Sequence, residues 1–240
     1  MDIYESYCKS YKISTDSRHI EPAAVFFALK GERFDGNDFA LEVAEQGIAS
    51  LVVADRQSLP DHPRIAKVEN SLEALQALAL HHRKSMKDLK VLSITGTNGK
   101  TTTKELVSAV LGKKYKLIST QGNYNNHIGV PLTLLRITPE TQFAVVEMGA
   151  NHPGEIKTLA SLACPDFGII TNIGKAHLEG FGSFEGVIKT KNELYDHLKS
   201  NNGTAFVNGD NALLFDLSKD LHRHTYGYGD ILFYIFYNKK

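Results

Sequence analysis

The sequence predicts an α/β protein in which a small amino-terminal α/β unit is followed by a larger, mostly parallel sheet flanked by helices. Two observations predict this fold class. Short apolar, β-like runs alternate with helical segments along the chain, which is typical of parallel sheets covered on both faces. One of these runs leads directly into a glycine-rich loop that opens a helix, at residues 96–101. The length of 240 residues accommodates two domains, which we expect at residues 1–86 and 87–240.

The composition excludes several classes of protein. Lys and Arg number 27, as do Asp and Glu, so the net charge is zero, and bulk charge does not favour nucleic acid or an anionic membrane as a partner. A hydrophobic content of 42% excludes a mainly disordered or fibrous chain. The longest strongly apolar run, residues 231–237, is far shorter than the roughly 20 residues of a membrane-spanning helix.

The cellular compartment is indicated by the chain start and by the cysteines. Residues 1–11 are polar throughout, unlike a signal peptide. Cys8 and Cys164 are too few for a disulfide framework or a structural zinc site. We therefore expect a cytoplasmic protein.

The first unit combines short strands with helices. The expected elements are strands at 24–29 and 50–54 and helices at 37–46 and 71–86. Ser71 is the expected cap of the second helix. The loop 30–38 carries two glycines and several charged side chains, so it either lines a binding surface or forms a solvated turn.

The second unit repeats the order strand, loop, helix. We expect strands at 89–95, 143–147, 167–172 and 204–208, and helices at 102–111, 154–163 and 186–198. In open α/β sheets, ligands bind beyond the carboxyl ends of the strands. Polar residues at those ends are therefore the candidates for a site.

The loop after the first of these strands has the character of a phosphate loop. Its glycines allow backbone N–H groups to converge on a phosphate, and the start of the helix adds positive potential. Lys100 can neutralise β and γ oxygens, and the Thr101 hydroxyl can hold Mg²⁺. The general pattern has a glycine where Ile94 stands, so this loop is a variant, and a simple glycine turn is the alternative. The candidate nucleotide-binding residues are Gly96, Thr97, Asn98, Gly99, Lys100, Thr101 and Thr102.

Three further strand ends or loops carry polar candidates. Glu147 ends the strand 143–147, where it can ligate a phosphate-bound Mg²⁺ or cap the next helix. His177 lies in a glycine-flanked loop after another strand. Asn125 and Asn126 belong to an amide-rich loop that either binds a polar ligand or forms turns.

Lys191 is a weaker candidate on residue chemistry alone. It alternates with Lys189 and Glu193 on an expected helix, and such alternation indicates a solvated face.

In combination, these motifs resemble the Mur ligases, the ATP-dependent amide-forming enzymes of peptidoglycan synthesis. The resemblance covers residues from about 13 to 215 and includes the variant spacing of the phosphate loop. The motifs that carry it in the second unit are GTNGKTTTKE (96–105), EMGANHPGEI (147–156), TNIGKAHLEGFGS (171–183) and KTKNELY (189–195). In the first unit, TDSR (15–18) and FFALKGERFDGNDF (26–39) resemble the uridine-nucleotide domain of the family.

The resemblance implies a role for each matching residue. Lys100 would contact the β and γ phosphates of ATP, and Thr101 with Glu147 would hold a first Mg²⁺. His177 would ligate a second Mg²⁺, and Lys191 aligns with a lysine that is carbamylated in the family. Lys100, His177 and Lys191 would thus be the catalytic set. The residues implied to face the substrate are Asp16, Ser17, Arg18, Lys30, Asp35, Gly36, Asn125 and Asn126.

The resemblance is strongest to the family member that acts on a tripeptide substrate. In the implied reaction, ATP phosphorylates the terminal carboxylate of UDP-N-acetylmuramoyl-tripeptide, and the amine of D-alanyl-D-alanine attacks the acyl phosphate. We expect a monomer with these two substrates as its partners. The third residue of the tripeptide stays open between meso-diaminopimelate and lysine.

The chain also departs from the family pattern. Family members have roughly twice its length, with a carboxyl-terminal domain and an adenine-contacting segment that this sequence lacks, and the tail 227–240 does not resemble the family's continuation. We therefore expect an incomplete central domain. The alternatives are a non-catalytic module that binds nucleotide or UDP-sugar, and a ligase similar to folylpolyglutamate synthase, which the uridine-type motifs disfavour.

Overall fold

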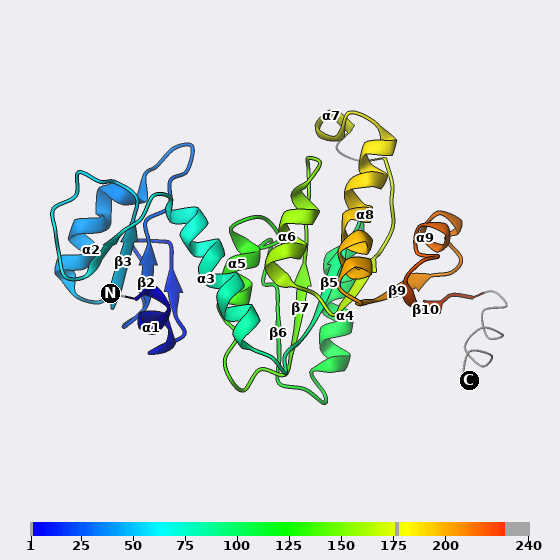
Figure 1. Cartoon of the computed structure of the whole chain (residues 1–240), viewed down its shortest axis with the longest axis horizontal. Helices are drawn as coiled ribbons and strands as arrows, with labels where there is room; N and C mark the ends of the chain where they lie inside the picture. Colours follow the sequence, from blue (N-terminus) through cyan, green and yellow to red (C-terminus); the bar gives the residue numbers. More distant parts are fainter. Residues whose placement is uncertain (1, 176–177, 229–240) are drawn as a thin grey trace. The chain divides into compact units, whose positions relative to one another are not determined.

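The computed structural model describes residues 2–175 and 178–228, and the chain forms two compact units (Figure 1). The first comprises Met1–Ser85 together with Leu134–Thr138, and the second comprises Met86–Thr133 and Pro139–Lys240. The predicted tail 227–240 lies largely outside the described residues. No helix in the described part of the chain is long and apolar enough to cross a membrane.

The first unit is built on a four-stranded parallel sheet in the order β1-β2-β3-β4. Its elements are α1 (Ile3–Cys8), β1 (Ile13–Ser14), β2 (Val25–Phe27), the 3₁₀ helix η1 (Gly36–Phe39), α2 (Ala40–Gln46), β3 (Leu51–Ala54), β4 (Ile65–Lys67) and α3 (Ser71–Ser85). Every residue of β2 and β3 is buried, because these central strands are covered on both faces. Phe26 and Val52 pack against Val43 of α2 in the core of this unit.

The cap of α3 differs from the prediction. The side-chain oxygen of Asn70 accepts hydrogen bonds from Leu72 N (2.9 Å) and Glu73 N (3.1 Å), so Asn70 is the cap. The expected cap, Ser71, is wrong: it is the first helical residue, and its N–H donates to Asp55 Oδ2 at 3.1 Å. Asparagine and serine are similarly good caps, and the sequence places them side by side.

The short segment Leu134–Thr138 is held in the first unit by two side chains. The Tyr7 hydroxyl donates to Leu135 O at 2.9 Å, and His82 Nε2 donates to Ile137 O at 2.9 Å. Both side chains are fully buried. The chain thus returns once to the first unit after entering the second, a crossing that its local sequence pattern does not reveal.

The second unit is built on a six-stranded parallel sheet in the order β10-β9-β8-β5-β7-β6. Its strands are β5 (Lys90–Thr95), β6 (Leu117–Ser119), β7 (Phe143–Glu147), β8 (Phe167–Ile170), β9 (Thr204–Asn208) and β10 (His222–Tyr226). Its helices are α4 (Lys100–Leu111), α5 (Gly129–Leu134), α6 (Glu155–Ala163), α7 (Leu178–Phe181), α8 (Phe184–Ser200) and α9 (Ala212–Leu217). Both sheets are parallel and are flanked by helices, so the predicted α/β fold class is confirmed.

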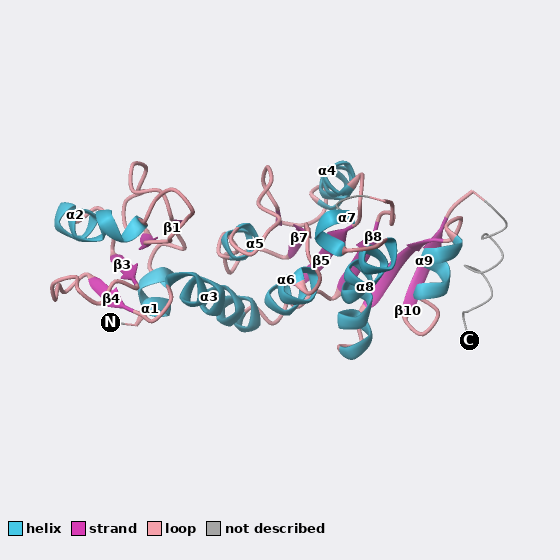
Figure 2. Cartoon of the chain, turned by 90° about the horizontal axis from the view of Figure 1, so that it is seen from above, coloured by secondary structure: helices cyan, strands magenta, loops and turns pink. Residues whose placement is uncertain are grey.

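The helices cover both faces of this sheet (Figure 2). Val107 and Leu111 of α4 pack on one face, against Leu92 and Ile94 of β5. On the other face α8 lies alongside α6 and approaches β8 closely, since a Cβ on Gly168 would meet the side chain of Leu198 at 2.6 Å. The sheet therefore presents the carboxyl ends of β5, β7 and β8 as one edge.

The strands β7 and β9 have the predicted bounds, whereas the helix α4 begins two residues earlier than expected, at Lys100. Lys100 and Thr101 consequently belong to the first helical turn. The elements that the periodicity did not predict include β4 and β6, of three residues each, and α5, of six residues, which are too short to show a repeating pattern.

Candidate functional site

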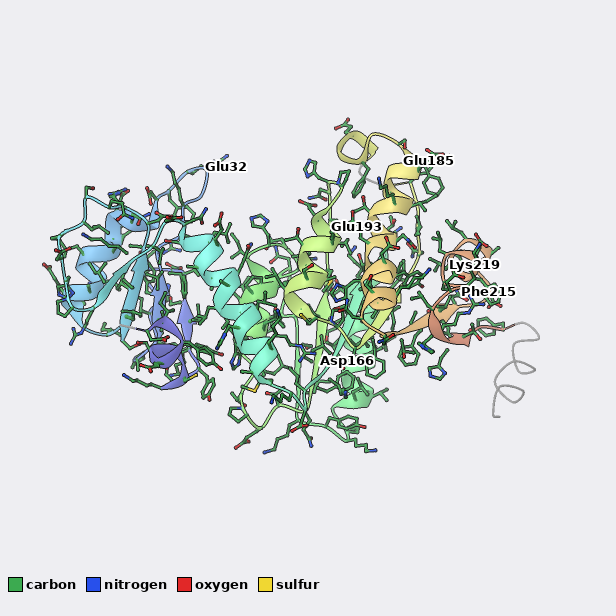
Figure 3. All side chains as sticks on the ribbon, in the orientation of Figure 1. Glu32, Asp166, Glu185, Glu193, Phe215 and Lys219 are labelled. Atoms are coloured by element: carbon green, nitrogen blue, oxygen red, sulfur yellow. The ribbon has the colours of Figure 1, made fainter. Side chains whose placement is uncertain are left out.

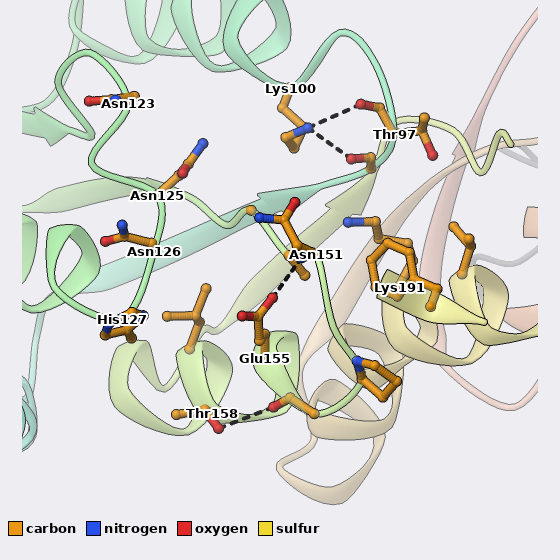
Figure 4. A pocket seen from close by; sticks show the side chains of 18 residues that line it. Thr97, Lys100, Asn123, Asn125, Asn126, His127, Asn151, Glu155, Thr158 and Lys191 are labelled. Atoms are coloured by element: carbon orange, nitrogen blue, oxygen red, sulfur yellow. Dashed lines mark hydrogen bonds between the residues drawn. The ribbon is translucent and has the colours of Figure 1, made fainter. Parts of the chain in front are cut away.

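A pocket of about 620 Å³ lies in the second unit (Figure 4). It combines the phosphate-type loop, the amide-rich loop before α5, the start of α6 and the helix α8. Its lining includes Gly96, Thr97, Lys100, Asn123, Asn125, Asn126, His127, Gly149, Asn151, Glu155, Thr158, Phe181 and Lys191. The parallel sheet explains this convergence, because the chain leaves β5 and β7 at the same edge.

The backbone of the loop between β5 and α4 requires glycine at two positions. Gly96 has φ 147° and Gly99 has φ 76°, a region that side chains with a Cβ rarely adopt. A Cβ at Gly96 would also collide with the Thr171 hydroxyl. Gly99 immediately precedes the first helical residue, Lys100, so the unpaired N–H groups of α4 face outward from this turn.

The loop after β8 holds the glycine-rich loop in place. Asn172 O accepts from Thr97 N at 3.0 Å, and Asn172 Oδ1 accepts from Asn98 N at 3.0 Å. Thr97 Oγ1 accepts from Gly174 N at 2.9 Å, and the Thr171 hydroxyl donates to Asn98 O at 2.6 Å. The candidate residues did not include Thr171 and Asn172, although their position directly after a central strand was the available signal.

Lys100 is folded back onto its own loop. Its Nζ donates to Gly96 O at 2.9 Å and to Thr97 O at 3.1 Å, as the dashed lines in Figure 4 show. These carbonyls are replaceable partners, and the long side chain can turn to a phosphate bound at the start of α4. Thr102, two residues further along the helix, is exposed.

Glu147 is buried, with 2% of its surface exposed, at the end of β7. The Thr101 hydroxyl donates to its Oε2 at 2.9 Å, and Asn125 Nδ2 donates to its Oε1 at 2.9 Å. The structure thus brings together three of the predicted site residues from three separate segments. Mg²⁺ takes oxygen ligands, commonly one or two carboxylates together with substrate phosphates, so Glu147 with the Thr101 hydroxyl fits a phosphate-bound magnesium ion while Asn125 holds the carboxylate in place.

Asn126, the neighbour of Asn125, has a different role. Its Oδ1 accepts from Ile128 N at 3.1 Å and from Gly129 N at 2.9 Å. This oxygen therefore caps the start of α5 while the residue lines the pocket. Of the two predicted asparagines, only Asn125 reaches Glu147.

Lys191 lies on α8 with 3% of its surface exposed, so the solvated face that its charge pattern indicated is wrong at this position. Burial and the nearby Lys100 lower the pKa of the Lys191 amine to about 8, while Glu155 and Glu193 act in the opposite direction. Its Nζ lies 5.8 Å from the centre of the Phe181 ring. A buried amine of this kind is a functional candidate.

Two carboxylates fix the start of α6 beside the pocket. Glu193, labelled in Figure 3, accepts from Gly154 N and Lys157 N, both at 2.8 Å. Glu155 accepts from Asn151 N at 2.6 Å and from His152 N at 2.9 Å, and these backbone bonds contribute to lowering its pKa. Glu193 was not among the predicted site residues, although it follows Lys191 by two positions.

His177 lies outside the described residues. Within the described part of the chain, no group of three or more His, Cys, Asp or Glu side chains forms a metal cluster.

The candidates in the first unit form two local groups. Asp16 accepts from Arg18 N, Nε and Nη2 at 3.0, 2.9 and 2.8 Å, and these bonds hold the pKa of the Asp16 carboxyl below its usual range. Ser17 between them is half-buried.

The second group is the loop from Lys30 to Asp35, which closes through an antiparallel bridge between these two residues. Gly36 N donates to Leu29 O at 2.8 Å. The buried Asn37 side chain ties the loop to β3, donating to Asp55 Oδ1 at 2.7 Å. The loop is thus tied at its base to the first unit, while Glu32, Arg33 and Phe34 at its tip are exposed.

Comparison with known protein families assigns both units. A model of the Mur ligase middle domain matches residues 94–231, and a model described as the Mur ligase family catalytic domain matches residues 9–83. The UDP-N-acetylmuramoyl-tripeptide–D-alanyl-D-alanine ligase of Bacillus subtilis is 42% identical over 220 residues, which cover 90% of this chain and 47% of the relative. The enzyme of the same name from Escherichia coli is 43% identical over 199 residues, covering 83% and 43%.

Solved structures show the same relationship. The MurF ligase of Thermotoga maritima in complex with ADP superposes with a TM-score of 0.81 at 33% identity, covering 95% of this chain and 51% of that one. MurF from Acinetobacter baumannii gives a TM-score of 0.78 at 37% identity, covering 91% and 48%. The chain spans about half the length of the relatives it matches. Its middle-domain match, its phosphate loop and its strand-end carboxylate agree, and the chain belongs to the Mur ligase family.

Proposed function

We propose that this protein is an ATP-dependent amide ligase of peptidoglycan precursor synthesis, which joins D-alanyl-D-alanine to UDP-N-acetylmuramoyl-tripeptide. The observation that carries the proposal is the contact of Thr101 and Asn125 with the buried Glu147, since Asn125 lines the same pocket as Lys100. The names of the relatives that are about 40% identical support this substrate pair.

In the proposed reaction, the γ-phosphoryl group of ATP passes to the terminal carboxylate of the tripeptide. The P–O bond to ADP breaks, a P–O bond to the carboxylate forms, and the amine of D-alanyl-D-alanine then displaces phosphate. The carboxylate and the triphosphate repel each other, so positive groups must bring them together. Lys100 and the N–H groups at the start of α4 bind the phosphate oxygens in this proposal.

Glu147 and Thr101 would hold a Mg²⁺ ion that spreads the charge of the transferred phosphoryl group. Asn125 orients the carboxylate through its amide, and Thr101 places its hydroxyl on the phosphate side of Glu147. Glu155, fixed by backbone N–H groups, remains ionised in the pocket wall.

Lys191 fits the carbamate implied by the family resemblance. A pKa of about 8 leaves a larger neutral fraction of the amine near neutral pH than an ordinary lysine has. The neutral amine attacks CO₂, loses a proton and becomes an anionic carbamate, which would serve as an oxygen ligand. With His177, it would complete a second magnesium site.

The first unit would bind the uridine nucleotide of the substrate. Asp16, Ser17 and Arg18, together with the loop bearing Lys30, Asp35 and Gly36, are the residues proposed for this role. We further propose that the protein is cytoplasmic and monomeric.

The test is ADP release by the 240-residue chain with Mg²⁺ and ATP, with and without the two substrates. Release that requires both establishes the ligase, and Lys100→Ala should abolish it while leaving binding of the UDP-substrate intact. Binding of the UDP-substrate without ADP release makes this chain a non-catalytic binding module. Binding of a folate instead would favour a ligase similar to folylpolyglutamate synthase.

A further inference from the structure

Lys104, on the inner face of α4, is a charged side chain in a buried place. Only 1% of its side chain is exposed. Its Nζ donates to Thr120 O at 2.7 Å and pairs with Glu105 Oε1 at 2.9 Å, and Glu105 itself is largely exposed. Burying an ammonium group is costly unless its hydrogen bonds are made. The hydrogen bond to Thr120 O therefore fixes the direction of the Lys104 side chain, which packing alone would not do.

Thr120 connects this hydrogen bond to the candidate metal site. It directly follows β6 and is 1% exposed. Its N–H donates to Val145 O at 3.0 Å, and its hydroxyl accepts from Glu147 N at 2.9 Å. The carbonyl group of Thr120 is thus held by Lys104, and its hydroxyl group holds the backbone N–H of Glu147.

The same carboxylate is contacted a second time from α4. Thr101, one helical turn before Lys104, donates to the Glu147 side chain. Asn125, which donates to the other carboxylate oxygen, lies on the loop that begins at Thr120. Helix α4 therefore fixes Glu147 at two points, at its tip through Thr101 and at its backbone through Lys104 and Thr120.

We propose that Lys104 is a positioning residue for the metal site. Through Thr120 it sets the backbone of Glu147 and the start of the loop that carries Asn125, and so fixes the separation of the two oxygen donors on Glu147 and Thr101. The metal part of this inference rests on the proposed function. The positioning part concerns the protein alone and can be tested without any ligand.

The first measurement is amide hydrogen exchange on the ligand-free chain. Lys104→Met keeps the length and shape of the side chain and removes the donor. We expect the Glu147 amide and residues 121–126 to exchange about tenfold faster, as a partly freed hydrogen bond allows, with β8 and β9 unchanged. Thr120→Val, which removes the hydroxyl acceptor, should reproduce the change at Glu147. The exposed Lys113→Met is the matched control and should leave all these rates unchanged.

The second measurement is binding of ADP with and without Mn²⁺. Lys104→Met should weaken Mn²⁺-dependent ADP binding about tenfold, as the loss of outer supporting contacts does at other metal sites, and leave metal-free ADP binding unchanged. Lys104→Arg, which restores a donor, should recover part of the loss. A fold-wide acceleration of exchange would overturn the proposal, since it would make Lys104 an ordinary core residue.

Faster exchange at Glu147 and residues 121–126 without a change in Mn²⁺-dependent ADP binding would also overturn the proposal. The metal site would then not depend on the hydrogen bond between Lys104 and Thr120. If the unmodified chain fails to bind ADP with Mn²⁺, the proposed function fails at its metal site. The exchange data still decide whether Lys104 holds the Glu147 backbone.

Discussion

The Thr101 hydroxyl lies 2.9 Å from Oε2 of Glu147, joining the first turn of α4 to the carboxyl end of β7. These residues are 46 positions apart in the chain and meet because β5 and β7 are parallel neighbours. The start of α4 is where a phosphate would bind. The pair therefore places the Glu147 carboxylate beside the proposed phosphate site, although the two residues are far apart in the sequence.

The buried amine of Lys191 predicts that the free energy of unfolding increases as the pH rises in alkaline solution. Its amine has a pKa of about 8 in the folded chain and about 10.4 when unfolded. The unfolded chain therefore binds more protons between these values, and unfolding becomes harder as pH rises. Relative to Lys191→Met, the unmodified chain should gain about 2 kcal/mol between pH 7.5 and 9.5 in urea unfolding. Carbon dioxide must be removed from the buffers, because it reacts with the neutral amine. A difference in the free energy of unfolding between the two proteins that does not change with pH would contradict the lowered pKa of Lys191.

His82 predicts a loss of stability in acid. It is fully buried and donates to Ile137 O, and burial lowers its pKa below the usual value of 6.5. As the pH falls below that value, His82 is protonated in the unfolded chain but stays neutral in the folded chain. The free energy of unfolding therefore decreases as the pH falls, until the folded pKa is reached. Thermal unfolding at pH 7.5 and 5.5 should show a smaller drop in Tm for His82→Gln than for the unmodified chain. His222→Gln, on an exposed residue, should show the full drop.

Glu193 of α8 is predicted to stabilise the fold by capping the start of α6, which forms part of the pocket wall. Its carboxylate accepts two backbone hydrogen bonds from the start of α6, and such charge-assisted caps contribute about 1–2 kcal/mol. Glu193→Ala should reduce the free energy of unfolding by about this amount. Lys189→Ala on the exposed side of the same helix should change it little, and equal effects of the two substitutions would remove the capping role.

The parts of the fold that the sequence predicted are those with local signals. The glycine-rich loop after a buried strand and the carboxylate at the end of β7 could be read directly, because glycine turns and strand ends carry residue-specific patterns. The strands β4 and β6, each three residues long, are too short for periodicity to distinguish from loops.

The supporting contacts of the site could not be predicted for a different reason. Lys104 and Thr120 are joined only by the packing of α4 against the end of β6, and a lysine on a helix is ordinarily read as solvent-exposed. The burial of Lys191 likewise depends on α8 lying against α6. Neither fact is contained in the local charge pattern.

The most direct test of the central claim is the effect of Mg²⁺ on ADP binding to this chain, measured by calorimetry for the unmodified protein and for Glu147→Gln. Glutamine preserves the shape of the side chain and removes its charge. We predict that Mg²⁺ strengthens ADP binding to the unmodified chain at least tenfold, in line with the loss expected when a metal ligand is removed, and has little effect on Glu147→Gln. ADP binding that is equally indifferent to Mg²⁺ in both proteins would contradict the proposed metal site at Glu147.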